Sequence, residues 1–461
     1  MNGFKTISPV DGSVYVEREF ASEASIDRAL DAAREAFAEW QMVALEQRQA
    51  LCQEFLGEFM QEEARIAEHL CWQMGRPIRY GAGEVRGFID RASTMIDLAP
   101  QALTPVTLPE KPGFRRYIER VPLGITLVVA PWNYPYLTAV NAIVPALLAG
   151  NVVLLKHSAQ TPLCAELLVE VAQRAGFPEG LLQCLHLSHE QVASLVKHPD
   201  IAHVAFTGSV AGGRAIELAA AGAFKHVGLE LGGKDPAYVR ADAHVQQAAE
   251  TVIDGAMFNS GQSCCGIERA YVHEAIYDEF VACAVDLVKA YVLGRPDDPD
   301  TTLGPMVSTK AARFVREQIA EAVHMGAEKL IAEEDFAMSR ADSAYLAPQL
   351  LVNVDHRMRV MTEESFGPVL GIQKVASDEE AVRWMNDSDF GLTAAIFTQD
   401  IERAAMLGKL LHTGTVFANR CDYLDPGLAW TGVKDSGRGC TLSTIGFEQL
   451  TRPKSFHLKE A

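Results

Sequence analysis

Short apolar runs alternate with amphipathic stretches in the middle of the chain, between residues 124 and 232. The apolar runs predict buried strands at residues 125–131, 151–156, 181–187, 203–209 and 226–232. Helical spacing of apolar residues predicts helices between them at residues 136–148, 162–175, 191–197 and 213–221. Uninterrupted apolar strands that alternate with helices indicate a parallel, doubly wound α/β sheet covered on both faces. Ligands bind such a sheet at the carboxyl ends of its strands.

Helical patterns precede this region, and mixed patterns follow it. Apolar residues recur at helical spacing in residues 26–40 and again in residues 51–59. From Gly233 a second set of helices and strands continues to about Thr415, which predicts a second α/β domain. The expected division is 1–114 for an N-terminal helical part of the first domain, 124–232 for its sheet, 233–415 for the second domain and 416–453 for a return to the first.

Composition excludes several classes of partner. The 461 residues suffice for two or three domains. A net charge of -19 argues against nucleic acid and anionic membranes, because phosphates attract Lys and Arg. We expect no secretory signal at the start, and no apolar run approaches the ~18 residues of a membrane span. The nine scattered cysteines fit neither a disulfide framework nor a metal site, so we expect a cytoplasmic protein without a metal.

The stretch FNSGQSCCGIE, residues 258–268, contains the adjacent cysteines Cys264 and Cys265. Two buried thiols are the ordinary explanation of such a pair, because cysteine is often buried. Gly261 and Gly266 nevertheless indicate a turn, and backbone amides in a turn can lower the pKa of a thiol and donate to an oxyanion. The residues alone therefore leave both a core pair and a nucleophile with a neighbour open.

Three further motifs stand at or near the ends of predicted strands. Asn133, in PWNYP, can donate to an oxyanion or form an Asx turn. Glu230, late in an apolar strand, is either a buried group with a partner or a general base with a raised pKa, and Gly232 and Gly233 permit a close approach behind it. FTGSVAGG, residues 206–213, opens a helix whose N-terminus can bind a phosphate, or is a glycine-rich turn.

The order of the motifs resembles that of the aldehyde dehydrogenase superfamily over nearly the whole chain. In sequence order they are PWNYP, NVVLLKHSAQTP, FTGS, LELGGK, GQSC, EESFGPV, NDSDFGL and GVKDSGRG. The resemblance implies a Rossmann-like cofactor domain and a hydrolytic, NAD(P)-dependent enzyme. It implies that Cys264 is the nucleophile, Glu230 the general base and Asn133 the oxyanion donor. The expected reaction oxidises an aldehyde to a carboxylic acid through a thiohemiacetal and a thioester on Cys264.

The resemblance also implies a cofactor site. Lys156 corresponds to a contact with the adenosine ribose, Ser209 to a contact with the pyrophosphate and Glu364 to a contact with the nicotinamide ribose. The full expected set is Trp132, Lys156, Ala159, Gly208, Ser209, Gly213, Leu231, Gly232, Glu364 and Phe366. Many members have a glutamate at the position of Ala159, and that carboxylate disfavours the 2′-phosphate of NADP. We therefore expect NAD as the cofactor, with NADP tolerated.

Substrate choice depends on less specific positions. The residues expected near the substrate are Tyr134, Asn141, Ser263, Cys265, Asp422, Tyr423, Asp425 and Trp430. Relatives that hold a carboxylate-bearing semialdehyde often have an arginine in the region of Asn141. The acidic, aromatic segment 421–430 suggests a neutral or cationic aldehyde, such as an amino-aldehyde, although loop-capping aspartates that face solvent explain it equally well.

Other enzyme types of the family stay open as alternatives. A succinate-semialdehyde-type or a CoA-acylating aldehyde dehydrogenase is the nearest of them. Glu230 favours the hydrolytic type over the CoA-acylating one, because the hydrolytic type needs a base that activates water. The presence of Cys264, Glu230 and Asn133 together argues against a non-catalytic relative.

Two positions depart from the family pattern. Many members have a lysine nine positions after the catalytic asparagine and a glutamate after the SGxGR-type turn, where this chain has Ala142 and Thr441. The route by which Glu230 exchanges its proton is therefore open. Cys265 is either a buried neighbour or a partner that captures an oxidised Cys264 in a reversible vicinal disulfide.

Family members associate through a small β extension. Residues 115–123 and 454–461 are the expected strands of this extension, because RRYIERV and KSFHLK alternate partly in polarity. We therefore expect a homodimer or a homotetramer.

Overall fold

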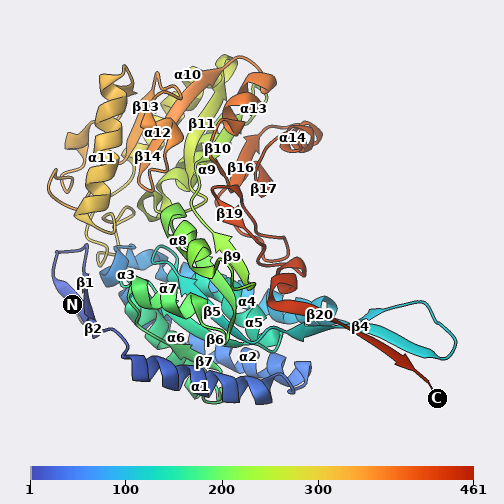
Figure 1. The fold of residues 1–461 in the computed structure, drawn as a ribbon. Coiled ribbons are helices and arrows are strands. Elements are labelled where there is room, and N and C mark those ends of the chain that lie inside the picture. The colour runs from blue at the N-terminus through green and yellow to red at the C-terminus, as the bar shows by residue number, and fades with distance from the viewer. Residues whose placement is uncertain (1–2, 461) are drawn as a thin grey trace.

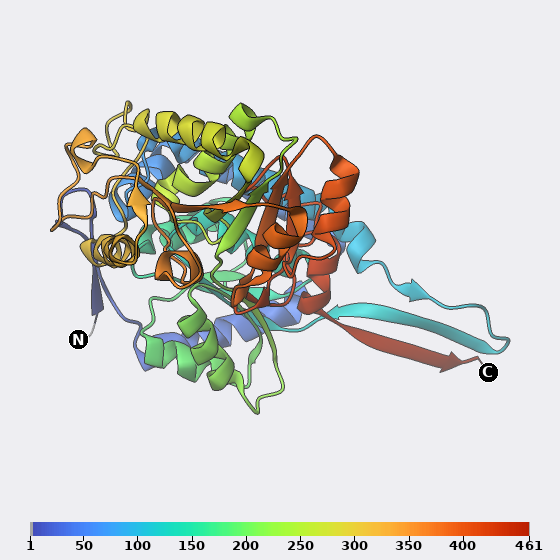
Figure 2. The ribbon, with the colours of Figure 1, turned by 90° about the horizontal axis from the view of Figure 1, so that it is seen from above.

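The computed structural model describes residues 3–460 and contains two large sheets, one above the other, with a thin β ribbon projecting from the side (Figure 1). The ribbon carries the C-terminus to its tip, as the view from above shows most clearly (Figure 2). The described helices include none that is long and apolar enough to cross a membrane.

The first sheet has six strands in the order β19-β9-β8-β5-β6-β7. Their bounds are β5 (Ile125–Ala130), β6 (Val152–His157), β7 (Leu182–Cys184), β8 (Ile201–Thr207), β9 (His226–Glu230) and β19 (Gly437–Arg438). All neighbours are parallel except β19, which runs antiparallel to β9. The chain first winds from β5 towards β7 and then returns to β8 and β9. This order confirms the doubly wound sheet and puts its switch point between β5 and β8, where ligand sites form.

Helices surround this sheet in one large apolar core. They are α1 (Glu23–Trp40), α2 (Leu45–Met60), α3 (Glu63–Met74), α4 (Gly81–Leu103), α5 (Pro135–Leu148), α6 (Pro162–Arg174), α7 (His189–Lys197) and α8 (Val210–Ala220). The amphipathic helix α1 buries Leu30, Ala33 and Trp40, and the hydroxyl of Ser22 caps its first turn. In contrast, α5 is apolar on nearly every face and almost completely buried. Its packing therefore holds the position of the segment that leads into its first residue.

The second sheet has seven strands in the order β12-β13-β14-β11-β10-β16-β17. Their bounds are β10 (Asp235–Val239), β11 (Ile267–His273), β12 (Glu328–Lys329), β13 (Gln349–Val352), β14 (Val369–Val375), β16 (Thr393–Phe397) and β17 (Thr415–Ala418). The sheet is parallel except for β12. Two separate apolar clusters lie against it. The helices of this part are α9 (Val245–Met257), α10 (Tyr277–Lys289), α11 (Thr309–His324), α12 (Arg359–Thr362), α13 (Asp378–Asn386) and α14 (Ile401–Gly408).

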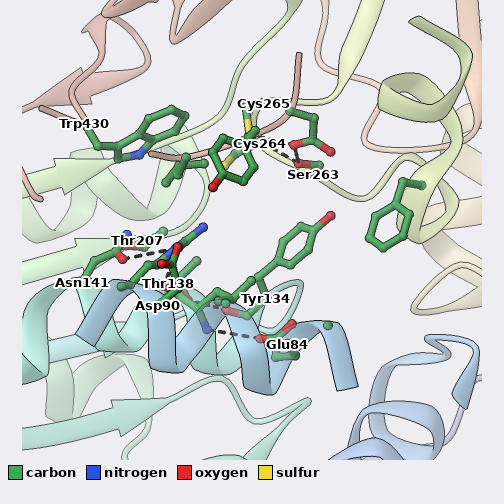
Figure 3. A pocket seen from close by; sticks show the side chains of 18 of the residues that line it. Glu84, Asp90, Tyr134, Thr138, Asn141, Thr207, Ser263, Cys264, Cys265 and Trp430 are labelled. Atoms are coloured by element: carbon green, nitrogen blue, oxygen red, sulfur yellow. Dashed lines mark hydrogen bonds between the residues drawn. The ribbon is translucent and has the colours of Figure 1, made fainter. Parts of the chain in front are cut away.

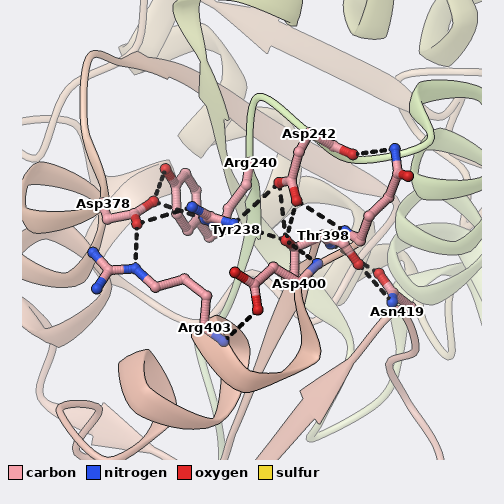
Figure 4. A network of polar contacts seen from close by, with 9 residues as sticks. Tyr238, Arg240, Asp242, Asp378, Thr398, Asp400, Arg403 and Asn419 are labelled. Atoms are coloured by element: carbon pink, nitrogen blue, oxygen red, sulfur yellow. Dashed lines mark hydrogen bonds and ion pairs between the residues drawn. The ribbon is translucent and has the colours of Figure 1, made fainter.

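A polar network joins β10, α13 and α14 at one end of the second sheet (Figure 4). Asp378 accepts hydrogen bonds from the Tyr238 hydroxyl at 2.7 Å, from Arg240 Nε at 2.9 Å and from Arg403 Nε at 2.8 Å. Beside it, the Asp242 carboxylate accepts from the Thr398 hydroxyl at 2.7 Å. The charges of these arginines and aspartates are thus paired within the network.

Smaller elements complete the fold. They are the N-terminal hairpin of β1 (Gly3–Ile7) and β2 (Val14–Glu19), the pair β15 (Phe390–Gly391) and β18 (Val433–Lys434), and the ribbon of β3 (Val106–Thr107), β4 (Phe114–Pro122) and β20 (Thr451–Lys459). The helical patterns near the start of the chain had not predicted the hairpin. In the ribbon, β4 and β20 pair antiparallel along their whole length, so the two segments expected to form strands do form them.

Candidate active site

Cys264 lies in a tight turn between η2 (Phe258–Gly261) and β11. The amide of Gly266 donates to the carbonyl of Ser263 at 3.2 Å, which closes the turn with the two cysteines at its centre. A Cβ at Gly233 would collide with the Cys264 carbonyl, so only glycine lets the LELGGK segment pass this close. The turn predicted from the sequence is therefore confirmed.

The Cys264 side chain stands between two hollows of the protein. A cavity of about 270 Å³, which we call the α4 cavity, is lined from α4, α5, the cysteine turn and the loop 422–430. A cleft of about 530 Å³, which we call the intersheet cleft, extends past the N-terminus of α8 and the start of α11. Cys264 and Thr207 line both. A molecule in either hollow can therefore reach the thiol.

Asn133 follows β5, at the switch point of the first sheet, and its side chain is buried beside the cysteine turn. The side-chain Nδ2 of Asn133 donates to the backbone carbonyl of Gln262 at 3.3 Å. The backbone carbonyl of Asn133 accepts from Asn259 Nδ2 at 3.2 Å and from Arg76. One hydrogen of Nδ2 is used in this contact, and Asn133 also lines the intersheet cleft. The second hydrogen is thus available to an oxygen bound near Cys264.

Glu230 ends β9 and lines the α4 cavity with Cys264. Its carboxylate accepts from the Thr441 hydroxyl at 2.5 Å and from the Thr207 hydroxyl at 3.2 Å. Burial raises the pKa of Glu230, while the two hydroxyls and the charge of Arg91 act in the opposite direction. A carboxylate with a raised pKa that faces a cavity fits a general base.

The two cysteines differ in their surroundings. Cys265 is buried, and its thiol donates to the Asp422 carboxylate at 2.9 Å. The Ser263 hydroxyl donates to the same oxygen at 3.0 Å. Contact with Cys264, burial and the Asp422 charge together raise the pKa of the Cys265 thiol well above its usual range. Cys265 is therefore held as a thiol, and Cys264, partly exposed to both hollows, is the better nucleophile.

The walls of the α4 cavity carry different kinds of group (Figure 3). Ser263, Cys264 and Cys265 lie on one wall, and Tyr134 and Asn141 lie on the facing wall. Of the eight residues expected near the substrate, only Asp425 is absent from this lining in the described chain. Its carboxylate instead accepts from the amide of Gly427 at 2.8 Å and is exposed, so Asp425 lies outside the cavity lining.

The intersheet cleft has the chemistry of a dinucleotide site. The residues of the expected cofactor set that line it are Trp132, Gly208, Ser209, Leu231, Gly232, Glu364 and Phe366. Ser209 caps α8 by accepting from the amide of Gly212, which leaves its hydroxyl hydrogen free to donate to a phosphate at the positive end of the helix. The rings of Trp132 and Phe366, which line the same cleft, meet edge to face with 5.6 Å between centroids. These groups fit the anionic and aromatic parts of a dinucleotide.

The other three residues of that set lie outside the lining of this cleft. Lys156 is buried at the end of β6, and burial lowers its pKa. Ala159 is exposed in the loop that follows β6. Gly213 packs against Leu231, and a Cβ there would collide with that side chain, so it brings α8 close to the sheet. Within residues 3–460, none of these three lines the α4 cavity or the intersheet cleft with Cys264.

A buried ion pair holds the segment that contributes Glu364 and Phe366 to the cleft. Glu268 accepts from Lys234 Nζ at 2.6 Å and from the amides of Ser365 and Phe366, each at 2.8 Å. Glu364 itself accepts from the amide of Gly233 at 2.9 Å, and burial raises its pKa to about 8. Glu268 thus fixes the backbone that presents the carboxylate, a role that no motif had indicated.

Sequence reasoning missed other functional positions. Thr207 and Thr441 hold Glu230, and Arg91 and the buried pair of Arg76 and Glu84 line the α4 cavity. The helical pattern of α4 gives no local signal for Arg91, because an arginine on an amphipathic helix is ordinarily a solvent-facing residue. Thr441 had been singled out only as a departure from a pattern.

Comparison with known proteins identifies close relatives of the whole chain. The sequence model described as "Aldehyde dehydrogenase family" matches residues 2–456. An aldehyde dehydrogenase of Paenarthrobacter nicotinovorans is 34% identical over 98% of both chains. The succinate-semialdehyde dehydrogenase [NADP(+)] of Deinococcus radiodurans is 32% identical over 98% of this chain and 94% of its own. Among solved structures, PnpE in complex with nicotinamide adenine dinucleotide superposes with a TM-score of 0.94 at 30% identity, covering 99% of this chain and 94% of that one.

Proposed function

The chain belongs to the aldehyde dehydrogenase family, and we propose that it oxidises an aldehyde to a carboxylic acid at Cys264, with Glu230 as the general base and Asn133 as the oxyanion donor. The observation that carries this assignment is the position of Cys264, whose side chain lines both the α4 cavity and the intersheet cleft. The aldehyde occupies the first and the cofactor the second.

The Cys264 thiolate attacks the aldehyde carbon, and a C–S bond forms as the carbonyl oxygen becomes an oxyanion. The free hydrogen of Asn133 Nδ2 and the backbone N–H of Cys264 stabilise that oxygen. A bound nicotinamide would supply the acceptor for the hydride, which leaves the carbon bonded to Cys264 as the oxyanion becomes a carbonyl, so that a thioester remains on Cys264. Glu230 then takes a proton from water, the water oxygen attacks the thioester, and the acid leaves as the thiol is regenerated.

The residues of the intersheet cleft would hold the cofactor. Ser209 and the N-terminus of α8 would bind the pyrophosphate, Glu364 would accept from the hydroxyls of the nicotinamide ribose, and Trp132 and Phe366 line the cleft beside them. Family members are NAD(P)-dependent oxidoreductases, and relatives of this chain are named for NADP or solved with NAD. With Ala159 in place of a repelling carboxylate, we propose that the enzyme uses NAD and tolerates NADP.

One assay tests the function. Formation of NADH and of NADPH is measured with a panel of aldehydes, with and without CoA. We expect activity with NAD, weaker activity with NADP and no acyl-CoA product. Cys264→Ala should lower turnover by ~10³-fold or more while cofactor binding, followed by fluorescence, is retained. Near-normal turnover of Cys264→Ala would contradict the assignment of Cys264 as the nucleophile. Formation of acyl-CoA would show that CoA, and not water, accepts the acyl group.

We also propose that the ribbon of β3, β4 and β20 joins subunits into a dimer or tetramer in the cytoplasm. An isolated ribbon of this kind has no core of its own and gains stability by packing against other elements, and here it projects from the body (Figures 1 and 2). All nine cysteines are free thiols, which suits a reducing compartment. A monomeric mass in solution would contradict the assembly.

A further inference from the structure

Arg91 presents an arginine side chain to the α4 cavity from the middle of α4. Four residues at helical spacing, Gly83, Gly87, Asp90 and Arg91, turn the same face of α4 towards the cavity. Arg91 Nη1 donates to the carbonyl of Leu137 at 2.6 Å and contacts Asn141 Oδ1 at 3.3 Å. Within residues 3–460 its Nε and Nη2 meet no acceptor, and no carboxylate pairs with it.

The other charged groups of the lining already have partners or face water. Arg76 is paired with Glu84, and the second Glu84 oxygen accepts from the amides of Tyr136 and Leu137 at 3.0 and 3.1 Å. Asp422 accepts from Ser263 and Cys265. Asp90 is exposed to solvent. Among the described residues, Arg91 is therefore the guanidinium of the cavity that no carboxylate contacts directly, although the charges of Glu84 and Glu230 act on it from a distance.

Burial lowers the pKa of Arg91, and the charges of Glu84 and Glu230, which act in the opposite direction, do not outweigh it. An anion that enters the cavity offsets this effect of burial. A guanidinium also has the geometry for it, since its parallel N–H groups match the two oxygens of a carboxylate. The free Nε and Nη2 lie on one edge of the guanidinium and can donate to both oxygens of one carboxylate.

The place of Arg91 also fits the direction of a bound substrate. Its contact with Asn141 puts the guanidinium on the wall that faces Cys264 (Figure 3). Asn141 lies in the region where the sequence had suggested that an anion-binding arginine was missing. The structure brings an arginine to that spot from α4 instead, and Asn141 helps to hold it. An aldehyde bonded to Cys264 would point its far end towards Arg91.

We propose that Arg91 binds a carboxylate at the far end of the substrate, so that the preferred aldehydes are semialdehydes of dicarboxylic acids. The inference rests on the proposed function, because Cys264 must take the aldehyde end. It reverses the charge that the segment 421–430 had suggested for the substrate. Asp422 lies on the cysteine wall, and two donors on that wall already occupy one of its oxygens, so that oxygen is not free to bind a cationic substrate.

The test compares aldehydes of equal length that differ only in the far group. The pairs are succinate semialdehyde with butanal and glutarate semialdehyde with pentanal, and 4-aminobutanal is the cationic counterpart. For the wild-type enzyme we expect kcat/KM about 10- to 100-fold higher for the carboxylate-bearing member, the size of one charged hydrogen-bond contact. In Arg91→Met this ratio should fall to near one, mainly through a higher KM for the carboxylate-bearing member.

Two variants separate recognition from structure. Arg91→Lys keeps the charge but loses the fork, so it should retain part of the preference. Arg86→Met changes an exposed arginine of the same helix and should leave the ratio unchanged. If Arg91→Met does not fold, the wild-type enzyme still answers: glutarate should raise its melting temperature or inhibit it more strongly than pentanoate does.

Several outcomes would overturn the proposal. Equal kcat/KM for both members of each pair in the wild type, or a preference for 4-aminobutanal, would contradict an anion site. A loss in Arg91→Met that is equal for neutral and acidic aldehydes would make Arg91 an electrostatic or structural support of the reaction. Absence of activity with every aldehyde would instead contradict the proposed function, so the two failures are distinguishable.

Discussion

Two clusters of charged side chains in this protein differ in how completely their charges are satisfied. In the network at the end of the second sheet, Asp378 faces Arg240 and Arg403 and also accepts from Tyr238 (Figure 4). In the α4 cavity, Glu230 accepts only from two hydroxyls within the described chain, and Arg91 has no carboxylate partner there. The first cluster joins elements, and the second leaves charge facing a hollow.

The pKa values show what the difference means. Burial alone would raise the pKa of Asp378, but hydrogen bonds from Arg240, Tyr238 and Arg403 outweigh it and lower the pKa to about 2. For Glu230 burial prevails, and its pKa is raised. Both carboxyls are perturbed, so perturbation by itself does not mark a functional site. An incompletely satisfied charge that faces a cavity is the better sign, because a substrate can complete it.

Replacement of the base in the cavity should have the largest effect. Glu230→Gln keeps the shape of the side chain but removes the carboxylate that accepts a proton from water. We expect steady-state turnover to fall by ~10²–10³-fold. The first turnover should still release NADH in a burst, because deacylation is the step that needs the base. Stopped-flow measurement of the burst and the steady state separates the two steps.

The outcome also bears on the comparison between the clusters. Glu230→Gln should melt close to the wild type, since the amide oxygen can still accept from one threonine hydroxyl and the amide nitrogen can donate to the oxygen of the other. Normal turnover would remove Glu230 from the chemistry. Loss of the burst together with turnover would move its action to the attack of Cys264.

Much of the site could be predicted because its motifs are local. The turn at Cys264 follows from its flanking glycines, and Asn133 and Ser209 follow the strands that meet at the switch point of the first sheet. Each of these positions depends on a few neighbouring residues and on the order of parallel strands. The strand patterns likewise sufficed for the doubly wound sheet.

Positions that depend on distant segments could not be predicted in this way. Asp422 and Asp425 share one loop, yet the first points into the α4 cavity and the second caps a turn in solvent. The direction of a loop side chain follows the backbone, and Asp422 has a φ of 46°, which composition does not reveal. Arg91 reaches the α4 cavity only after α4 has packed against the first sheet. Thr441 likewise reaches Glu230 only after the segment that follows β19 has packed there.

Mutation of the polar network at the end of the second sheet should have the opposite effect to mutation of the α4 cavity, because it should lower stability and leave activity unchanged. Asp378→Asn removes the charge that holds Arg240 and Arg403, so we expect a loss of up to about 2 kcal/mol of unfolding free energy at neutral pH with kcat unchanged. The folded pKa of about 2 lies below 3.8, the ordinary value for an aspartate, so this stability is present above pH ~4 and lost as pH falls towards 2. Melting curves between pH 7 and pH 3 should therefore converge for the wild type and the variant.

A neighbour on the same helix serves as the control. Glu379 is 82% exposed and lies 3.7 Å from Arg403, so Glu379→Gln should change the melting temperature little. A constant gap between wild type and Asp378→Asn at all pH values would contradict a charge effect. A fall in kcat for Asp378→Asn with an intact fold would end the distinction between the two clusters.

The smallest expected effect is a change in the pKa of Glu230 when one of its hydrogen-bond donors is removed. Thr441→Val removes the hydroxyl that donates to Glu230 at 2.5 Å and keeps the shape of the side chain. That hydrogen bond favours the charged carboxylate, so its loss should raise the pKa of Glu230 further. A base must be deprotonated to act, and activity is lost as pH falls through its pKa. The acidic limb of the kcat–pH profile should therefore move to higher pH, with little change at the plateau.

Thr207→Val is the matched control. The hydroxyl of Thr207 is 3.2 Å from Glu230, so its removal should shift the acidic limb less. An unshifted limb in both variants would mean that another group controls that limb, and a lowered plateau in Thr441→Val alone would give Thr441 a part in proton exchange beyond that of a hydrogen-bond donor.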